Sequence, residues 1–538
     1  MRRDRDTWDE VCAAFLNPTF YPHAVTEIRR MDTHISTVFL TGEKVYKLKK
    51  PVDLGFLDYS RLEDRHRFCH EEVRLNQRLS TGVYLGVAAV RRDSNGRLSL
   101  DGPGQEVEYA VCMRQLDPSH SLEARLKAGT LVPAAMEALG RRLAAFYASA
   151  QRSREIDRFG MPEAITYNVQ ENFAQTERFA GTWLDRERWE FIGTVADHFL
   201  NRHSGLFMNR IAQGRIRDGH GDLRPDHIYF AESLQIIDCI EFNDRFRYGD
   251  TAVDLAFLHM DLDLAGAAQW SHRALSAYVE AARDPGLYRL LDFYACYRAM
   301  VRVKVCCLRA DQLPKGDRKP LIQSARRYLQ QAYRHAVHFA TPTLWICCGL
   351  PASGKSRLAR SLASLLEIDA IHSDQIRREL MDRPEQAPSV TSFGKGMYRP
   401  ERKKQVYAQL LARAHDRLRS GRSVIVDATF SQGRWRREAL RLADDLDGSI
   451  VFLECGCPTA VLEERLRARE TKPTDSDARL HHLPGFLETY EPTDDLPEDV
   501  LCRIDTQAPH HETVLKAMNA AYPLLSKQSR RRASQADG

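Results

Sequence analysis

Apolar and polar positions follow one pattern in the first two-thirds of the chain and another in the last third. Residues 35–50 carry two short apolar runs around a Thr-Gly-Glu-Lys turn, which predicts a β-hairpin. Residues 62–79 place apolar side chains at helical spacing on one face, which predicts a helix. Further strands are expected at residues 107–113, 227–230 and 235–240, and helices at residues 133–211, with a break near Gly160, and 251–336.

After residues 340–342 the pattern restarts as strand and helix in turn. Apolar strands are expected at residues 344–348, 423–426 and 450–453, and a helix at residues 356–366. Strands that alternate with helices are typical of a parallel sheet with helices on both faces. The C-terminal region is therefore predicted to be an α/β domain.

The length of the chain also requires more than one domain. Single hydrophobic cores stop growing at roughly 250–300 residues, and this chain has 538. The predicted divisions are an N-terminal extension (1–32), an α+β domain (33–339), an α/β domain (343–525) and a polar, Arg-containing tail expected to be disordered (526–538).

The composition is that of a globular protein, and it does not indicate a binding partner. Hydrophobic residues make up 43% and charged residues 28%, which is ordinary for a globular protein, and the net charge of +5 argues neither for nor against nucleic acid. No run approaches the ~18 apolar residues of a membrane span, and no signal peptide is recognisable. The 12 Cys form no CxxC pair and lie mostly in apolar runs, so we expect buried reduced thiols and a cytoplasmic protein.

The sharpest motif lies between the first predicted strand and helix of the α/β region. Residues 349–356 match G-x-x-x-x-G-K-[ST] at every position, with Gly349, Gly354, Lys355 and Ser356 as the defining residues. The glycines allow a tight loop whose N–H groups face phosphate oxygens, next to a helix N-terminus. We expect Lys355 to neutralise the β- and γ-phosphates of ATP and Ser356 to ligate Mg²⁺.

Three further positions fit a phosphate-transfer site. Asp374 follows a predicted strand, where a carboxylate faces the ligand side of an α/β sheet and could take a proton from an acceptor hydroxyl. Arg377 could bind an acceptor anion, although an N-cap Asp followed by a surface Arg is the alternative. Asp427 ends a hydrophobic strand, as a metal-binding carboxylate does, and Arg465 and Arg469 share a helix face that could close on the phosphates.

These residues resemble the P-loop kinase family that includes polynucleotide kinases, zeta toxins and gluconate kinases. The resemblance covers residues 343–506, and residues 476–478 (Ser-Asp-Ala) are similar to a segment of the smaller members. It implies that Asp374 is the acceptor-side base, Arg377 an acceptor contact, and Arg465 and Arg469 lid arginines. It does not name the acceptor.

A second motif lies in the N-terminal region. Residues 220–228 (His-Gly-Asp-Leu-Arg-Pro-Asp-His-Ile) resemble the H-G-D-x-x-x-x-N catalytic loop of aminoglycoside phosphotransferases. The resemblance implies that Asp222 accepts the proton of the attacking hydroxyl and that Asp238, at a strand end, binds Mg²⁺. Where the family has a metal-binding Asn this chain has His227, a bulkier and softer ligand.

The same resemblance, which covers residues 33–333, implies an ATP-binding lysine on an early strand. Lys47 is the expected residue, although Lys49 points to the same face of the strand. Glu72 on the following helix is the expected ion-pair partner, with Glu71 as the alternative.

Asp250 and Asp254 resemble the family's next motif. We interpret both as structural residues that bond the backbone of the catalytic loop.

The whole arrangement resembles bacterial proteins that fuse an aminoglycoside-phosphotransferase-like domain to a P-loop ATPase or kinase domain. It implies an ATP- and Mg²⁺-dependent phosphotransferase with a small-molecule or nucleotide-like acceptor. One alternative is a nucleic-acid end kinase, for which residues 434–437 (Arg-Trp-Arg-Arg) offer a modest basic-aromatic cluster. The other is a regulatory ATP-binding protein with a degenerate N-terminal domain, which His227 favours.

Overall fold

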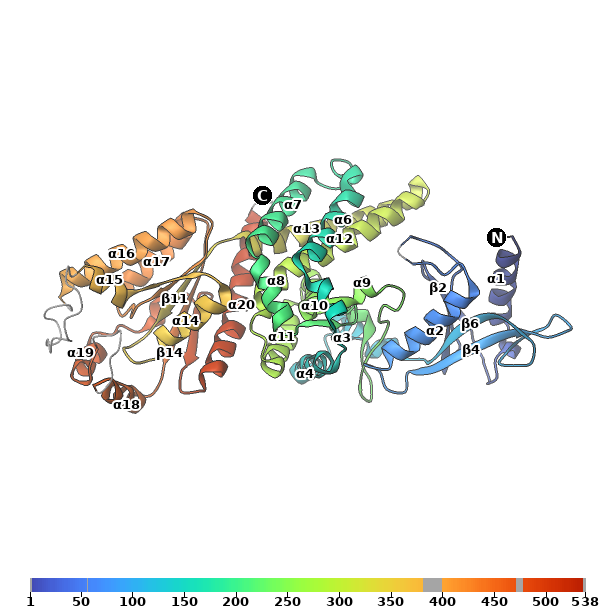
Figure 1. The fold of residues 1–538 in the computed structure, drawn as a ribbon, viewed down its shortest axis with the longest axis horizontal. Helices are drawn as coiled ribbons and strands as arrows, with labels where there is room; N and C mark the ends of the chain where they lie inside the picture. Colours follow the sequence, from blue (N-terminus) through green and yellow to red (C-terminus); the bar gives the residue numbers. More distant parts are fainter. Residues whose placement is uncertain (1, 56, 381–398, 471–477, 536–538) are drawn as a thin grey trace. The chain divides into compact units, whose positions relative to one another are not determined.

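The computed structural model describes residues 2–55, 57–380, 399–470 and 478–535. Figure 1 shows the ribbon with its helices and strands labelled. The chain forms two compact units, each made of two stretches of sequence. The first unit comprises Met1–Asn168 and His203–Tyr278, and the second comprises Val169–Arg202 and Val279–Gly538.

The first unit contains a six-stranded antiparallel sheet in the order β1-β2-β3-β6-β4-β5. The predicted hairpin is confirmed as β2 and β3, and helix α2 (Leu62–Asn76) packs on the sheet through the buried Cys69. The strands are β1 (Arg29–Asp32), β2 (Ser36–Leu40), β3 (Lys44–Lys49), β4 (Tyr84–Arg92), β5 (Leu98–Leu100) and β6 (Gln105–Arg114).

The N-terminal residues belong to this sheet and its core. Helix α1 (Arg2–Phe15) buries Val11 and Phe15 in the same apolar cluster as Phe39 and Tyr46, and β1 pairs with β2. The residues predicted to be an extension thus supply the first strand and part of the core, because α1 presents an apolar face that the sheet covers.

The rest of the first unit is mostly helical, with two short antiparallel pairs, β7–β10 and β8–β9. In sequence, β7 precedes the H-G-D segment, and β8, β9 and β10 follow it. The elements are α3 (Leu122–Ala128), α4 (Pro133–Ser149), α5 (Arg154–Asp157), α8 (Ser204–Ala212), β7 (Ile216–Asp218), β8 (Ile228–Phe230), β9 (Leu234–Ile236), α9 (Asp244–Arg247), β10 (Tyr248–Asp250) and α10 (Thr251–Leu264). Helices α6 (Pro162–Thr176) and α11 (Ala268–Ala282) each run across a division between the units.

The second unit contains the predicted parallel sheet. Its five strands run in the order β12-β13-β11-β14-β15, and every pair is parallel. Helices α16 (Pro400–Arg419) and α17 (Gly433–Asp445) cover one face, and α14 (Lys355–Leu366) and α20 (His510–Gln535) pack on the other (Figure 1). The remaining elements used below are β11 (Thr343–Cys348), β12 (Asp369–His372), α15 (Ser373–Glu379), β13 (Val424–Asp427), β14 (Ser449–Gly456), α18 (Thr459–Glu470) and β15 (Leu501–Asp505).

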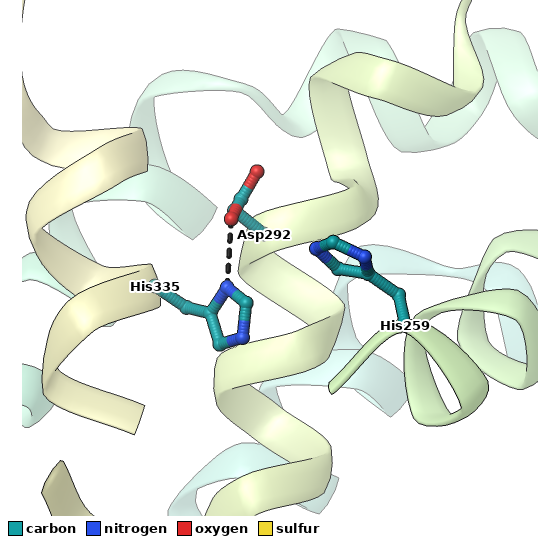
Figure 2. A group of neighbouring side chains, drawn as sticks. All are labelled: His259, Asp292 and His335. Carbon is teal, nitrogen blue, oxygen red and sulfur yellow. Dashed lines mark hydrogen bonds and ion pairs between the residues drawn. The ribbon is translucent and has the colours of Figure 1, made fainter. Parts of the chain in front are cut away.

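Helices α7 (Arg186–Arg202), α12 (Leu287–Gln312) and α13 (Lys319–Ala340) belong to the same unit as the parallel sheet. The buried carboxylate of Asp292 on α12 accepts hydrogen bonds from His335 Nδ1 on α13, at 2.7 Å (Figure 2), and from the Tyr522 hydroxyl on α20, at 2.6 Å. The division between units therefore differs from the predicted boundary at residues 340–342, because α20 packs against these two helices.

The C-terminal segment corrects one prediction. Residues 526–535, expected to be disordered, continue helix α20, and Ser529 and Ala533 are buried. Gln528 Nε2 donates to the Ile450 carbonyl at 2.9 Å, and Arg532 Nη1 donates to Ser449 Oγ at 2.7 Å. These polar side chains bond the start of β14, a role that the composition of the segment does not reveal.

Two expectations from composition can be compared with the structure. All 12 Cys are free and ten of them are buried, as the apolar context of the thiols predicts. None of the helices in the described part of the chain combines the length and the apolar character that a bilayer-spanning segment needs.

Candidate functional site

In the loop between β11 and α14, two glycines leave the backbone accessible. Gly349 has a φ of +128°, and a Cβ there would lie 2.3 Å from the Cys455 carbonyl oxygen. Gly354 has a φ of +92° directly before the first residue of α14. Residues with a side chain rarely adopt such angles, so both positions require glycine. The loop ends at a helix N-terminus, where backbone N–H groups and the helix dipole favour an anion.

A pocket of about 590 Å³ lies beside this loop. Arg465 is fixed there, because its guanidinium donates to the carbonyls of Ala352 at 3.1 Å and Thr506 at 2.7 Å. Lys355 makes one long contact, 3.5 Å from its Nζ to the Leu350 carbonyl. The lining residues include Gly354, Lys355, Ser356, Arg465, Arg469 and Thr506. The pocket thus gathers Gly354, Lys355 and Ser356 of the motif and both predicted lid arginines. Residues 476–477 of the predicted Ser-Asp-Ala segment lie outside the described residues.

A second pocket shares Lys355 and Ser356 with the first. Asp374 and Arg377 line it and form an ion pair with each other, one turn apart on α15. Its other lining residues include Lys403, Tyr407 and Thr429. The structure therefore places the predicted base and the predicted acceptor contact on one side of Lys355 and the two arginines of α18 on the other.

Asp427 lies at the end of β13, in register with Cys347 just before the loop. Its side chain is buried, and Oδ2 accepts a 2.8 Å hydrogen bond from His372 Nδ1. The other oxygen, Oδ1, has no hydrogen-bond partner among the described residues. A buried carboxylate oxygen without a donor suits a cation or its bound water, so Asp427 fits the predicted Mg²⁺ role.

The basic-aromatic cluster at residues 434–437 is divided between the core and the surface. Arg436 is 1% exposed and Trp435 4% exposed. Arg436 pairs with Asp495 at 2.6 Å, and Trp435 stacks on Tyr407 with ring centroids 4.6 Å apart. Half of the feature that favoured a nucleic-acid substrate is thus part of the core, whereas Arg434 and Arg437 are exposed.

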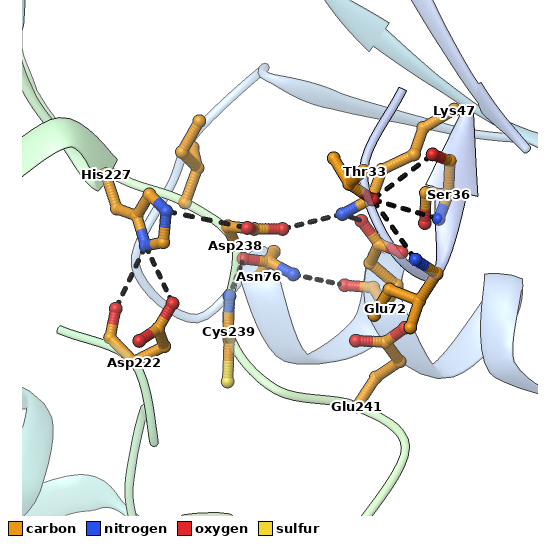
Figure 3. A network of polar contacts seen from close by, with 12 residues as sticks. Thr33, Ser36, Lys47, Glu72, Asn76, Asp222, His227, Asp238, Cys239 and Glu241 are labelled. Atoms are coloured by element: carbon orange, nitrogen blue, oxygen red, sulfur yellow. Dashed lines mark hydrogen bonds and ion pairs between the residues drawn. The ribbon is translucent and has the colours of Figure 1, made fainter. Parts of the chain in front are cut away.

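In the first unit, Lys47, Glu72 and Asp238 meet (Figure 3). Lys47 Nζ lies 2.9 Å from Glu72 Oε1 and 2.6 Å from Asp238 Oδ1. Glu71, the alternative partner, instead pairs with Arg74 on the outer face of α2 at 2.5 Å. The arrangement is the one expected of an ATP-binding lysine with its helix carboxylate.

Lys49 forms a second, deeper ion pair with the same glutamate. Its ammonium is fully buried, lies 2.7 Å from Glu72 Oε2, and also pairs with Glu241. Glu241 accepts a 2.6 Å hydrogen bond from the Tyr59 hydroxyl. Burial alone would raise the pKa of Glu72, but the two lysines outweigh it and hold that pKa below its ordinary value. Local spacing gives no sign of Glu241, which lies 192 positions from Lys49.

Asp222, His227 and Asp238 converge across the same site (Figure 3). One ligand atom from each lies within 4.8 Å of the others. His227 Nδ1 lies 2.9 Å from the Asp222 carbonyl oxygen, to which we assign its N–H, and Nε2 faces Asp238 Oδ2 at 3.5 Å. Asp238 has a φ of +63°, a strained angle that aims its carboxylate at this point. His227 and Asp238 fit a divalent cation, with a nitrogen ligand in place of an amide oxygen, and Asp222 lies beside them.

The loop itself is held by Asp254. Its carboxylate accepts from the backbone N–H groups of His220 at 2.6 Å and Gly221 at 2.9 Å, as predicted. Asp250 is structural in a different way, because it pairs with the buried Arg210 at 2.6 Å and caps α10. Burial lowers the pKa of His220 to about 4, so this imidazole is neutral at physiological pH.

The chain is similar to several known proteins. Residues 344–493 match the family described as AAA domain. The chain is also similar to a gluconokinase structure from Sinorhizobium meliloti 1021 (21% identity, 37% of this chain and 98% of that one, TM-score 0.25). It is similar to a choline/ethanolamine kinase family protein from Mesorhizobium loti (11% identity, 61% of this chain and 99% of that one, TM-score 0.36).

Fold and site together define a chain with an α+β region built on a six-stranded antiparallel sheet and an α/β P-loop region with a five-stranded parallel sheet, as the sequence predicts. The chain belongs to the family of the uncharacterized proteins Rv2004c of Mycobacterium tuberculosis and Mb2027c of Mycobacterium bovis. Each is 34% identical over 518 residues, which cover 96% of this chain and 98% of the relative.

Proposed function

We propose that the chain is an ATP- and Mg²⁺-dependent phosphotransferase with two ATP-binding sites. Each site transfers the γ-phosphate to a hydroxyl of a small-molecule or nucleotide-like acceptor. The observation that carries the proposal is the meeting of two pockets at Lys355 and Ser356. The first pocket is lined by the phosphate loop and the arginines of α18, and the second is lined by the carboxylate of Asp374.

The P-loop site has a group for each part of the transfer. The acceptor oxygen bonds to the γ-phosphorus while the bond from that phosphorus to the β–γ bridging oxygen breaks, so that ADP leaves. Asp374 takes the hydroxyl proton, and Lys355 and Arg465 stabilise the negative charge on the phosphate oxygens. Ser356 and Asp427 would hold Mg²⁺, which neutralises phosphate charge when it is bound.

The N-terminal site offers the same roles on a different scaffold. Lys47, held by Glu72, would bind the α- and β-phosphates, and Asp222 would take the proton of the attacking hydroxyl. His227 and Asp238 would hold the metal ion. The convergence of these groups from β3, α2 and the H-G-D loop supports a second phosphate-transfer site.

The test uses the full chain and measures ATP turnover first without an acceptor and then with a metabolite panel. Lys355→Ala and Asp222→Asn silence one site each, and mass spectrometry identifies the phosphorylated product. Each variant should lose part of the turnover, and the double variant all of it. Turnover that survives the double variant would contradict the proposal. A turnover that depends on Lys355 alone would instead favour a regulatory N-terminal domain.

A further inference from the structure

Lys403 of α16 is a cation in the acceptor-side pocket that the chain itself does not neutralise. Its side chain is partly buried and lines the pocket together with Asp374 and Arg377. Its Nζ donates a 3.0 Å hydrogen bond to Ser431 Oγ. Among the described residues no carboxylate lies within ion-pair distance of this ammonium, and Asp374, the acidic residue that lines the pocket, pairs with Arg377.

The surroundings of Lys403 make this charge costly. Burial lowers the pKa of Lys403, the positive charges of Arg434 and Arg377 lower it further, and Glu491 opposes them, with the result that the pKa falls to about 8. A partly desolvated ammonium among like charges is less stable than one in water, and a bound anion would stabilise it. The site therefore has an excess of positive charge on the side where an acceptor would enter.

In the first unit, carboxylates balance the charge of each buried lysine. Lys49 is fully buried and contacts two carboxylates, Glu72 and Glu241. Lys47 also contacts two, Glu72 and Asp238. Lys403 has a hydroxyl in their place, which hydrogen-bonds an ammonium without balancing its charge. This contrast argues that the missing negative charge comes from a ligand.

We propose that Lys403 binds an anionic group of the phosphate acceptor. The acceptor of the P-loop site is then a hydroxy compound that carries a phosphate or a carboxylate beside the hydroxyl that reacts. The inference rests on the proposed function, because the pocket that contains Lys403 is the acceptor pocket only if its neighbour at Lys355 and Ser356 binds ATP. Asp374 would face the reacting hydroxyl, and Lys403 would hold the second, charged end.

The test is calorimetry on the full chain saturated with ADP and Mg²⁺, with inorganic phosphate and acetate as separate probes. At least one anion should bind the wild type, and the stronger probe distinguishes a phosphate from a carboxylate. Lys403→Met should weaken that binding by about ten- to a hundredfold, the usual range for a charge-assisted hydrogen bond. Lys403→Arg should retain it. Lys404→Met, at the exposed neighbouring position, is the matched control and should not change it.

A second measurement needs no substitution. Acetic anhydride modifies accessible neutral amines, and peptide mass spectrometry reports the rates at Lys403 and Lys404. The anion that binds should slow modification of Lys403 alone. Equal anion affinity in wild type and Lys403→Met, or no protection of Lys403 by either probe, would overturn the inference. ADP binding that Lys355→Ala does not weaken would overturn the P-loop proposal as well, whereas ADP binding that depends on Lys355, without anion binding, would overturn only the role of Lys403.

Discussion

The lysines of the two candidate ATP sites differ in whether carboxylates balance their charge. In the first unit, Lys47 lies 2.9 Å from Glu72 and 2.6 Å from Asp238, so its charge is already balanced. In the second unit, Lys355 makes only a 3.5 Å contact with the Leu350 carbonyl. The first site is a closed network of ion pairs, and the second is an open cation beside a loop of backbone donors.

This difference predicts the relative affinities of the two sites for ATP. A triphosphate at Lys47 has to compete with Asp238, so part of its binding energy replaces an existing ion pair. A triphosphate at Lys355 meets an ammonium with no carboxylate partner among the described residues, and there the gain is not offset in this way. We therefore expect the P-loop site to bind ATP more tightly than the N-terminal site.

The largest effect is expected from Asp222→Asn in a Lys355→Ala background, where only the N-terminal site works. Loss of a general base should lower its phosphotransfer by about 10²–10⁴-fold. ATP binding should stay nearly unchanged, because Asp222 is assigned to the acceptor hydroxyl. Single-turnover transfer and calorimetry measure the two quantities, and an unchanged rate would remove Asp222 from the mechanism.

Next in size is the effect of Glu72→Gln on local stability. Glu72 is fully buried between Lys47 and Lys49, and removing its charge should cost about 3 kcal/mol, as for other broken buried ion pairs. Glu71→Gln is the matched control, because its surface pair with Arg74 should contribute at most about 1 kcal/mol. Amide hydrogen exchange in peptides from β3 and α2 reports the difference. Equal exchange in the two variants would mean that the network does not hold the site closed.

A smaller effect is expected from pH at the acceptor pocket. The pKa of Lys403 is about 8, so its ammonium loses its proton as pH rises through that value. Anion affinity should accordingly be full below pH 8 and fall by about tenfold per pH unit above it. Lys403→Arg stays charged and should give a flat profile over the same range. A wild-type profile as flat as that of the arginine variant would contradict the assignment.

The smallest effect is expected from His227→Asn. An amide oxygen in place of the imidazole restores the ligand type of the resembled family, so transfer at the N-terminal site should stay equal or rise. Binding of Mn²⁺, followed by electron paramagnetic resonance, should weaken relative to Mg²⁺, because imidazole suits transition metals better. A sharp fall in rate would give His227 a specific role beyond that of a ligand.

Motifs with a fixed local spacing could be predicted from the sequence. The phosphate loop, the H-G-D loop and the lysine strand each occupy a few consecutive residues, and the structure brings their members together. Asp254 could be predicted for the same reason. It lies in the motif that follows the H-G-D loop in sequence, and its carboxylate accepts a hydrogen bond from the backbone of that loop.

Residues joined only by the fold could not be predicted in this way. Glu241 pairs with Lys49 across 192 positions, and Lys403 reaches the acceptor pocket from α16 without any motif around it. The helix that continues through residues 526–535 was missed because its polar side chains bond β14, which no local pattern reveals. In each case the local sequence does not reveal which distant backbone group or charged side chain lies next to the residue in the fold.

The most direct test of two separate sites is calorimetry with a non-hydrolysable ATP analogue on the full-length wild type and on Lys355→Ala. Lys355, the first residue of α14, is partly exposed and makes one long polar contact, so its truncation should change stability by no more than about 0.5 kcal/mol. The variant should lose about ten- to a hundredfold in affinity at the P-loop site and keep the N-terminal site. The account predicts two binding events in the wild type, the tighter of which is weakened in the variant. Retention of both sites at wild-type affinity would contradict the phosphate-loop assignment, and loss of both would contradict the independence of the two sites.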